Sequence, residues 1–349
     1  MSAYVARPAI ALPQHVITTD DICDDIARHH SGHPQLATYL RVAKTVGVRT
    51  RRFSRPLNSP TVSGSAGIEE RNLVAFEDSA RLAEEAARGA MANAGLGPSD
   101  IDAVVTSHTT SWTTPGLDVH LVNALGLRPD VRRTPMASLG CGGGAQALAR
   151  AADDVAARPG ARVLVVAAET LSTVYRHEDD GLGSMIYKAL FGDGAGACVV
   201  TDAPLGPGFR IDACWEYLLP DSLDRYWCSV DERGLHFDST RKAADATGEV
   251  LPLLVDWLDG LEAPRPEWTV VHAGGPRILE NAVKYLGVEE KVLRHSWSSL
   301  EEYGNLGGVS VLDVLARTYE EPPGPGAPGL LTAFGPGFFA AACQGAWCE

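Results

Sequence analysis

The sequence predicts an α/β fold built from two similar halves. Apolar runs typical of buried strands, such as residues 161–170, alternate with segments of helical apolar spacing, such as residues 145–160. The order of strand, glycine-rich turn, apolar helix, Pro/Gly break and buried strand occurs in the first half and again after residue 268. With 349 residues, 45% of them apolar and 21% charged, the chain is long enough to bury a large core and to form two domains.

The elements of the first half follow in order along the chain. Residues 6–30 are expected to form a leader strand and a helix, and residues 55–67 a polar loop rich in Ser, Pro and Gly. Residues 76–96 have helical apolar spacing and end with a glycine signal, and residues 101–109 form an apolar strand. The helix and the buried strand named above complete this half.

The second half begins where the composition changes. Residues 201–210, TDAPLGPGFR, are rich in Pro and Gly, which predicts a boundary between domains of residues 1–205 and 206–349. Within the second half, residues 268–272 are expected to form a buried strand and residues 276–287 a helix.

Two short motifs occupy matching places in the halves. GCGGG at residues 140–144 precedes the helix of the first half, and GNLGG at residues 304–308 precedes a helix of the second. Cys141 therefore stands where Asn305 stands in the repeat. Duplicated α/β units usually pack about a pseudo-two-fold axis, so both helix starts are expected to face one central site. The alternative is that glycine recurs before a helix by chance.

Composition and charge narrow the function. A net charge of −14 argues against nucleic acid or an anionic membrane as the main partner. No apolar run reaches the roughly 18 residues of a membrane span, and the N-terminus lacks the pattern of a signal peptide, so a cytoplasmic location is expected. The seven cysteines are scattered and odd in number, which indicates free thiols and neither a disulfide framework nor a zinc site. A small-molecule enzyme is the leading expectation.

Three polar residues stand where acyl-thioester chemistry would need them. Cys141 lies at a helix start, where unpaired N–H groups and the helix dipole favour a thiolate and a lowered pKa. His272 ends a predicted buried strand and can act as the base or cationic partner of that thiol. Asn305 offers an amide donor for a developing oxyanion. Taken singly, each has a plainer interpretation: a core thiol, a structural histidine and a helix cap.

A rival interpretation concerns dinucleotide binding. Gly140, Gly142 and Ala145 match G-x-G-x-x-A. Glu169 ends the following strand as a ribose-binding acid would, and the chain would then be an oxidoreductase. Such a loop should follow a buried strand, whereas residues 132–140 contain a proline and few β-branched residues. This interpretation also leaves the asparagine of the second motif unexplained.

Five longer motifs are highly specific when they occur together: GCGGG, ALFGDGAGA, HAGGPRIL, EYGNLGG and AFGPG. On these motifs the chain resembles, over nearly its whole length, the type III polyketide synthases, chalcone synthase-like members of the thiolase superfamily. The resemblance implies a thiolase-like αβαβα layered fold, a homodimer and a reaction that needs no metal or redox cofactor.

The same resemblance implies roles for single residues. Cys141, His272 and Asn305 look like the catalytic triad. Phe191 and Phe237 look like the two phenylalanines that separate a coenzyme A tunnel from the cavity. The family's C-terminal loop, which scaffolds the active site, corresponds to Phe334, Gly335, Pro336 and Gly337.

The basic residues that would bind the phosphates of coenzyme A are less clear, because the family's own do not align cleanly. Arg41 and Lys44 lie on neighbouring turns of a predicted helix and could serve, since a basic cluster in an acidic protein is a place for an anionic ligand to dock. A solvated basic face is the alternative.

Within the family, the segments RPAIALPQHVIT, SGHPQ and GVRTR resemble most the bacterial synthases that make 1,3,6,8-tetrahydroxynaphthalene. Where those enzymes tend to have Cys-Thr-Gly-Phe-Met-Met-Pro, this chain has TTSWTTP at residues 109–115. Thr109, Trp112 and Thr114 are therefore expected to line the cavity, and the indole of Trp112 to change its shape. The expected product is a pyrone or a phenolic ring, shorter than a pentaketide naphthalene.

The activity that the resemblance implies is acyl transfer. Malonyl-CoA would be decarboxylated and condensed onto an acyl-CoA starter held on Cys141, and the chain would then cyclise. The nearest alternative is an enzyme like ketoacyl-ACP synthase III, which condenses once and takes malonate from acyl carrier protein. The proline of AFGPG and the acidic balance favour the polyketide interpretation, because acidic carrier proteins prefer basic docking faces. A binding module without catalysis would not need all three polar residues.

Overall fold

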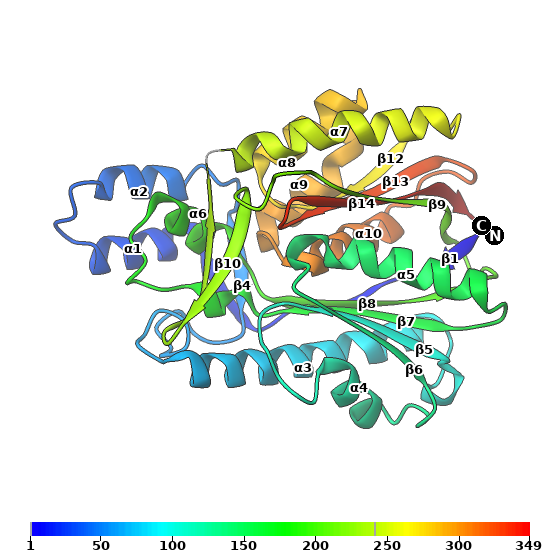
Figure 1. The fold of residues 1–349 in the computed structure, drawn as a ribbon, viewed down its shortest axis with the longest axis horizontal. Coiled ribbons are helices and arrows are strands. Elements are labelled where there is room, and N and C mark those ends of the chain that lie inside the picture. Colours follow the sequence, from blue (N-terminus) through cyan, green and yellow to red (C-terminus); the bar gives the residue numbers. More distant parts are fainter. Residues whose placement is uncertain (1, 241) are drawn as a thin grey trace.

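The structure, a computed structural model, describes residues 2–240 and 242–349. Its main elements stack as five layers in the order helix, sheet, helix, sheet and helix (Figure 1). Helices α3 and α4 cover one outer face, α7 and α8 cover the other, and α5 and α10 lie in the middle. This is the predicted αβαβα order.

The elements of the first half are β1 (Ala3–Val5), β2 (Ala9–Ala11), β3 (His15–Thr18), α1 (Thr19–His29), α2 (Leu36–Ala43), β4 (Thr50–Phe53), α3 (Ile68–Asn93), β5 (Ala103–His108), α4 (Leu117–Leu125), β6 (Arg132–Ala137), α5 (Gly143–Ala157), β7 (Val163–Glu169), α6 (Leu182–Leu190) and β8 (Gly194–Thr201). Those of the second half are β9 (Gly208–Leu218), β10 (Tyr226–Asp231), β11 (Gly234–Ser239), α7 (Ala243–Gly260), β12 (Trp268–Val271), α8 (Pro276–Leu286), α9 (Arg294–Tyr303), α10 (Ser310–Glu320), β13 (Pro328–Gly335) and β14 (Phe339–Cys348).

Among the described residues, no helix combines the length and the apolar character needed to cross a membrane.

One sheet runs through both halves in the order β12, β13, β14, β9, β1, β8, β7, β5 and β6. The short β1 joins the halves, because it pairs with β9 on one side and with β8 on the other. β5 runs parallel to its neighbours β6 and β7, and β12 runs parallel to β13. In each half, the carboxyl ends of parallel strands therefore point to the region where a site is expected.

The central layer holds the core that both halves share. Helix α5 is rich in alanine, and its buried Ala147 and Ala151 pack in one apolar cluster with Val311 and Leu315 of α10. Alanine costs little helix propensity and lets a helix approach closely, so a thin layer fits between two parts of the sheet. Separate apolar clusters lie beneath α3 with α4 and beneath α7 with α8.

The starts of α5 and α10 meet, as the repeat predicts. A Cβ atom on Gly144 would lie only 2.0 Å from the backbone oxygen of Gly308, so the contact requires glycine. Short turns at Gly140–Gly142 and Gly307–Val309 precede the two helices and contact each other. Cys141 and Asn305 thereby come to one place.

The segment before Gly140 is not the buried strand that a dinucleotide-binding loop would follow. Arg132–Ala137 forms strand β6, which the sequence analysis did not single out, and its side chains are mostly exposed. β6 lies at the edge of the sheet, and among the described residues it pairs with β5 alone. Proline is tolerated there, because an edge strand needs hydrogen bonds on one side only.

Helices α1, α2 and α6 gather with the β10–β11 hairpin at one end of the molecule, on the left in Figure 1. These elements lie beside the layered body, and they form the surroundings of the cavity described next.

Candidate active site

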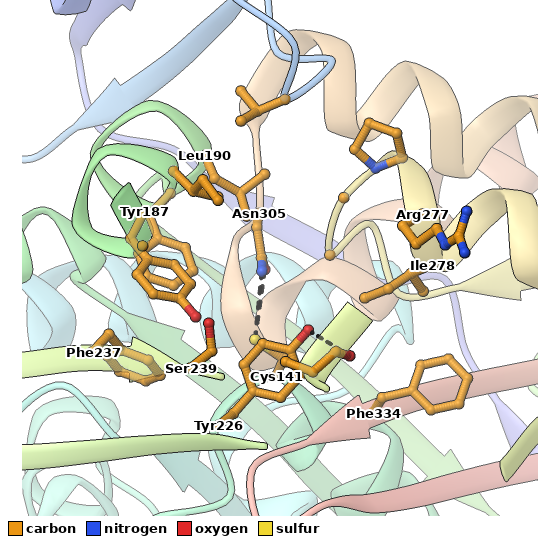
Figure 2. Close-up of a pocket in the computed structure, with 18 of the residues that line it drawn as sticks. Cys141, Tyr187, Leu190, Tyr226, Phe237, Ser239, Arg277, Ile278, Asn305 and Phe334 are labelled. Carbon is orange, nitrogen blue, oxygen red and sulfur yellow. Dashed lines mark hydrogen bonds between the residues drawn. The ribbon is translucent and has the colours of Figure 1, made fainter. Parts of the chain in front are cut away.

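A cavity of about 690 Å³ lies where the two halves meet. Its walls come from the end of α2, from α6, from the β10–β11 hairpin, from the turn between β12 and α8, and from the loop after β13. Cys141, His272 and Asn305 all line it. Figure 2 shows the side chain of Asn305 directed at the sulfur of Cys141. Both halves are therefore needed to complete the site.

The amide of Asn305 connects the other two residues. Its Nδ2 lies 3.5 Å from Sγ of Cys141, and its Oδ1 lies 3.1 Å from Nε2 of His272. The backbone N–H of Gly307 donates to the same Oδ1 at 2.8 Å. A backbone N–H can only donate, so it fixes which end of the amide is oxygen. Nε2 of His272 then carries its hydrogen toward Oδ1, and the Nδ2 hydrogens face the thiol.

The backbone around Cys141 is built for close approach. Gly140 has a φ of +51°, in the left-handed region, and a Cβ atom there would lie 2.9 Å from the ring of Pro336. Its N–H donates to Oγ1 of Thr109 at 3.0 Å. The loop after β13 and the end of β5 thus hold the turn that carries the nucleophile.

Burial controls the protonation of the site. It raises the pKa of the Cys141 thiol to about 12, although the hydrogen bond from Asn305 acts in the opposite direction. It lowers the pKa of His272 to about 4. The expected lowering of the thiol pKa at the helix start is therefore wrong for the resting site, because desolvation of a thiolate outweighs the donors around it. A neutral thiol faces a neutral imidazole, and thiolate forms only as a base takes the proton.

Comparison with known proteins identifies the fold around this site. The family model of chalcone and stilbene synthases matches with its N-terminal domain at residues 3–204 and with its C-terminal domain at residues 211–342. The chain belongs to this family of type III polyketide synthases. In a solved structure, the 1,3,6,8-tetrahydroxynaphthalene synthase of Streptomyces coelicolor, the fold is the same, with a TM-score of 0.94 at 35% identity over 99% of both chains. The predicted family and thiolase-like fold are confirmed.

Characterised relatives in the family differ in their products. The 1,3,6,8-tetrahydroxynaphthalene synthase of Streptomyces griseus is 36% identical over 99% of this chain and 93% of its own length. The phloroglucinol synthase of Pseudomonas fluorescens is 33% identical over 97% of this chain and 98% of its own. The similarity to enzymes with two different products means that the product of this synthase depends on its own cavity.

Several cavity residues of this type III polyketide synthase lie where the sequence suggested. Phe191 and Phe237 line the cavity with ring centroids 5.5 Å apart. Phe334 and Gly335 line it from the end of β13, and Pro336 from the loop that follows. Gly337 is not in the wall, and its carbonyl accepts a hydrogen bond of 2.6 Å from the hydroxyl of Ser222.

The segment of residues 109–115 does not line this cavity, so that expectation is wrong for the cavity within one chain. Trp112 is 44% exposed, and its backbone N–H donates to Oδ1 of Asn72 at 2.7 Å. Thr114 is likewise absent from the wall. Thr109 does not line it either, but its Oγ1 accepts the hydrogen bond from the N–H of Gly140, next to Cys141. The sequence correctly placed these residues directly after strand β5, but it did not show in which direction the loop of residues 109–115 leaves that strand.

Glu169, which only the rival interpretation had given a role, lies close to the catalytic turns. It ends β7, is buried, and accepts a hydrogen bond of 3.1 Å from the backbone N–H of Thr109. Burial raises its pKa to about 8. A Cβ atom on Gly307 would lie 3.1 Å from its side chain, so Glu169 packs directly beneath the Asn305 turn. The parallel pairing of β7 with β5 was the signal that could have placed it here.

The mouth of the cavity, where exposed Thr45, Arg277 and Glu280 line it, has charges of both signs. Exposed Arg41 and Lys44 lie beside it, next in sequence to the lining residues Val42 and Thr45. Lys44 Nζ is 3.9 Å from Oδ1 of Asp20, a weak pairing at an exposed place. Arg277, in the first turn of α8, is a basic residue of the mouth that was not among the predicted ones.

One group of side chains in the described part of the chain could hold a metal ion by distance, namely Asp25, His29 and His177. The two imidazole rings are parallel, with centroids 3.5 Å apart and 8° between their planes. A metal ion lies near the plane of a ligating imidazole, so two stacked rings cannot both direct a lone pair at one ion. None of the three lines the cavity, and we assign no metal to them.

Proposed function

We propose that Cys141, His272 and Asn305 are the catalytic residues of this malonyl-CoA-dependent acyltransferase. The observation that supports the proposal most directly is the amide of Asn305, which lies between the thiol and the imidazole at 3.5 Å and 3.1 Å in a cavity open to substrate. A nucleophile, a proton acceptor and fixed donors meet at one point, which is what thioester exchange and decarboxylation require.

In the first step, the enzyme takes up the starter. In the resting site Nε2 of His272 carries the ring hydrogen, so for this step that hydrogen first moves to Nδ1. Nε2 then accepts the proton of Cys141, and Sγ attacks the carbonyl carbon of an acyl-CoA. The bond between that carbon and the sulfur of coenzyme A breaks, and the leaving thiolate takes the proton from His272. The products are an acyl-Cys141 thioester and free coenzyme A.

In the second step, malonyl-CoA is extended onto this thioester. Nε2–H of His272 and Nδ2–H of Asn305 donate to the thioester carbonyl oxygen of malonyl-CoA. The carbon–carbon bond to the carboxylate breaks and carbon dioxide leaves. The electron pair of that bond forms an enolate, whose oxygen these donors stabilise. The enolate carbon attacks the acyl group on Cys141, and the bond from that acyl carbon to Sγ breaks. The chain is now a coenzyme A thioester, longer by one β-keto unit. For the next round the freed Sγ thiolate attacks its thioester carbon, the bond to the sulfur of coenzyme A breaks, and the leaving thiolate takes a proton from solvent.

The remaining expectations belong to the same proposal. After several rounds the chain cyclises to a pyrone or a phenolic ring. The steps are nucleophilic and acid–base chemistry, so no metal or redox cofactor enters them. We expect the protein to act as a homodimer in the cytoplasm, on malonyl-CoA and an acyl-CoA starter, with Arg41 and Lys44 near the phosphates of coenzyme A.

Product analysis tests the proposal. The purified protein is incubated with malonyl-CoA alone, with malonyl-CoA plus a panel of acyl-CoA starters, and with malonate carried on acyl carrier protein, and products are identified by mass spectrometry. We expect polyketides from the CoA substrates. Product from the carrier protein alone would contradict the proposal and support a single-condensation enzyme of the ketoacyl synthase type.

A further inference from the structure

Three aromatic rings form one continuous part of the cavity wall. The ring of Tyr187 stacks on Phe191, with centroids 5.2 Å apart and 16° between the planes. The edge of Phe237 packs against both rings, at 6.0 Å from Tyr187 and 5.5 Å from Phe191. All three line the cavity, and Tyr187 is 8% exposed. Such packing holds a ring in place, because aromatic neighbours on two sides leave no other rotamer free.

The hydroxyl end of Tyr187 reaches toward the β10–β11 hairpin. Tyr187 comes from α6 and Ser239 from the end of β11, and both line the cavity. Figure 2 shows their two hydroxyl groups pointing toward each other. The ring therefore extends across the cavity wall from α6 to the hairpin.

The position of the ring is fixed relative to the catalytic centre. Phe191 and Asn305 form a backbone bridge, in which the N–H of Asn305 donates to the carbonyl of Leu190 at 2.8 Å and the N–H of Gly192 donates to the carbonyl of Asn305 at 3.1 Å. One helical turn earlier, the carbonyl of Tyr187 accepts from the N–H of Phe191 at 3.1 Å. An unbroken series of backbone hydrogen bonds therefore links the oxyanion donor to the tyrosine. The backbone of Tyr187 is therefore held in a fixed place relative to Asn305, the residue that contacts the reacting sulfur.

We propose that the ring of Tyr187 sets the upper limit on the length of the chain that grows on Cys141. This inference rests on the proposed function, because only an enzyme that extends a chain has such a limit. Each round moves two more carbons from the sulfur into the cavity, and a rigid ring at a fixed distance excludes the chain that would overlap it. The role is one of specificity: Tyr187 is not needed for thioester formation or decarboxylation.

Substitution of Tyr187 separates its ring from its hydroxyl. Tyr187→Phe keeps the ring, Tyr187→Ala removes it, and Tyr187→Leu removes the aromatic plane but keeps an apolar side chain against Phe191, in case the alanine variant does not fold. Trp112→Ala is the matched control, since it removes an aromatic ring that the structure places outside the cavity. Products from malonyl-CoA, alone and with one acyl-CoA starter, are compared by mass spectrometry at equal substrate consumption.

We expect the longest product of Tyr187→Ala or Tyr187→Leu to contain at least one more malonyl-derived unit than that of the wild type. Tyr187→Phe and Trp112→Ala should keep the wild-type length. If the alanine and leucine variants consume malonyl-CoA and still stop at the wild-type length, the inference is wrong. It is also wrong if both fold but lose all turnover, since Tyr187 would then belong to the chemistry. A wild type that makes no polyketide from any CoA substrate would overturn the proposed function, and this inference with it.

Discussion

Nδ2 of Asn305 lies 3.5 Å from Sγ of Cys141, and this contact joins the two helix starts of the repeat. The amide cannot turn over without losing the N–H of Gly307 at 2.8 Å and Nε2 of His272 at 3.1 Å from its oxygen. Its donor end is therefore held toward the reacting sulfur before any substrate arrives, which is the condition for electrostatic preorganisation.

Asn305→Ala removes a donor from the place where enolate charge develops. Loss of one such donor typically costs about 2.7–4 kcal/mol, so decarboxylation of malonyl-CoA should fall roughly a hundred- to thousandfold. Acylation of Cys141 should fall much less. Release of carbon dioxide from labelled malonyl-CoA and acyl transfer from the starter measure the two half-reactions separately. Asn281→Ala, at another buried asparagine whose side chain does not line the cavity, is the control. Equal losses in both half-reactions would assign Asn305 to a structural cap.

Cys141→Ser should abolish condensation, because a serine hydroxyl is a far weaker acid than a thiol and gives almost no anion for thioester exchange. The mass of the intact wild-type protein should rise by one acyl group after incubation with an acyl-CoA, and that of the variant should not. Cys228→Ser, at an exposed cysteine outside the cavity wall, should acylate like the wild type. An acylated Cys141→Ser protein would show that the nucleophile is elsewhere.

Glu169→Gln should change how stability depends on pH. The pKa of Glu169 is about 8 in the folded protein, raised by burial from an ordinary value of 4.5. Between these values the folded state binds a proton that the unfolded state has lost, so the free energy of unfolding falls as pH rises from 5 to 8, by up to about 4 kcal/mol. Because glutamine does not ionise, the Glu169→Gln variant should lack this decrease in the free energy of unfolding. Chemical denaturation at pH 5 and pH 8 measures it, with Glu85→Gln at an exposed position as control. A variant as pH-dependent as the wild type would contradict the shift.

Arg41→Ala combined with Lys44→Ala should weaken the binding of coenzyme A thioesters. An exposed charge pair contributes about 0.2–1 kcal/mol, so the KM for malonyl-CoA should rise by a factor of about 1.4 to 5 for each charge removed, with kcat little changed. A malonyl thioester without the nucleotide phosphates should show no such change, which separates charge from packing. Lys291→Ala, on an exposed side chain away from the mouth, is the control. An equal rise in KM for both thioesters would show that these residues do not act through the phosphates.

The sequence was sufficient to predict the fold class, the repeat and the residues that meet at its centre. Cys141 and Asn305 stand at equivalent positions of two glycine-rich turns, and a glycine turn before an apolar helix is a local signal that survives without an alignment. His272 followed from its place at the end of a buried strand. These predictions hold because each depends on backbone geometry that neighbouring residues encode.

The cavity walls were harder to predict, because they depend on the direction of loops. Trp112 belongs to a segment that leaves the sheet away from the cavity, and nothing in its sequence gives that direction. Tyr187 was missed, although it lies four residues before Phe191 and therefore on the same face of a helix. Strand β6 was missed because Pro135 argues against a central strand, and an edge strand carries no such restriction.

The close approach of Gly144 to Gly308 has a consequence for how such a protein can evolve. A side chain at Gly144 would push α5 and α10 apart, and the separation of sulfur and amide would grow with them, whereas a Cβ atom at Gly308 would meet its nearest atoms at 3.2 Å. The reacting distance thus depends above all on Gly144, a residue that has no room to vary. The wall at Tyr187 is made of side chains, which single substitutions can exchange while the backbone stays in place. Descendants of this chain can therefore acquire new products without rebuilding the reaction that makes them.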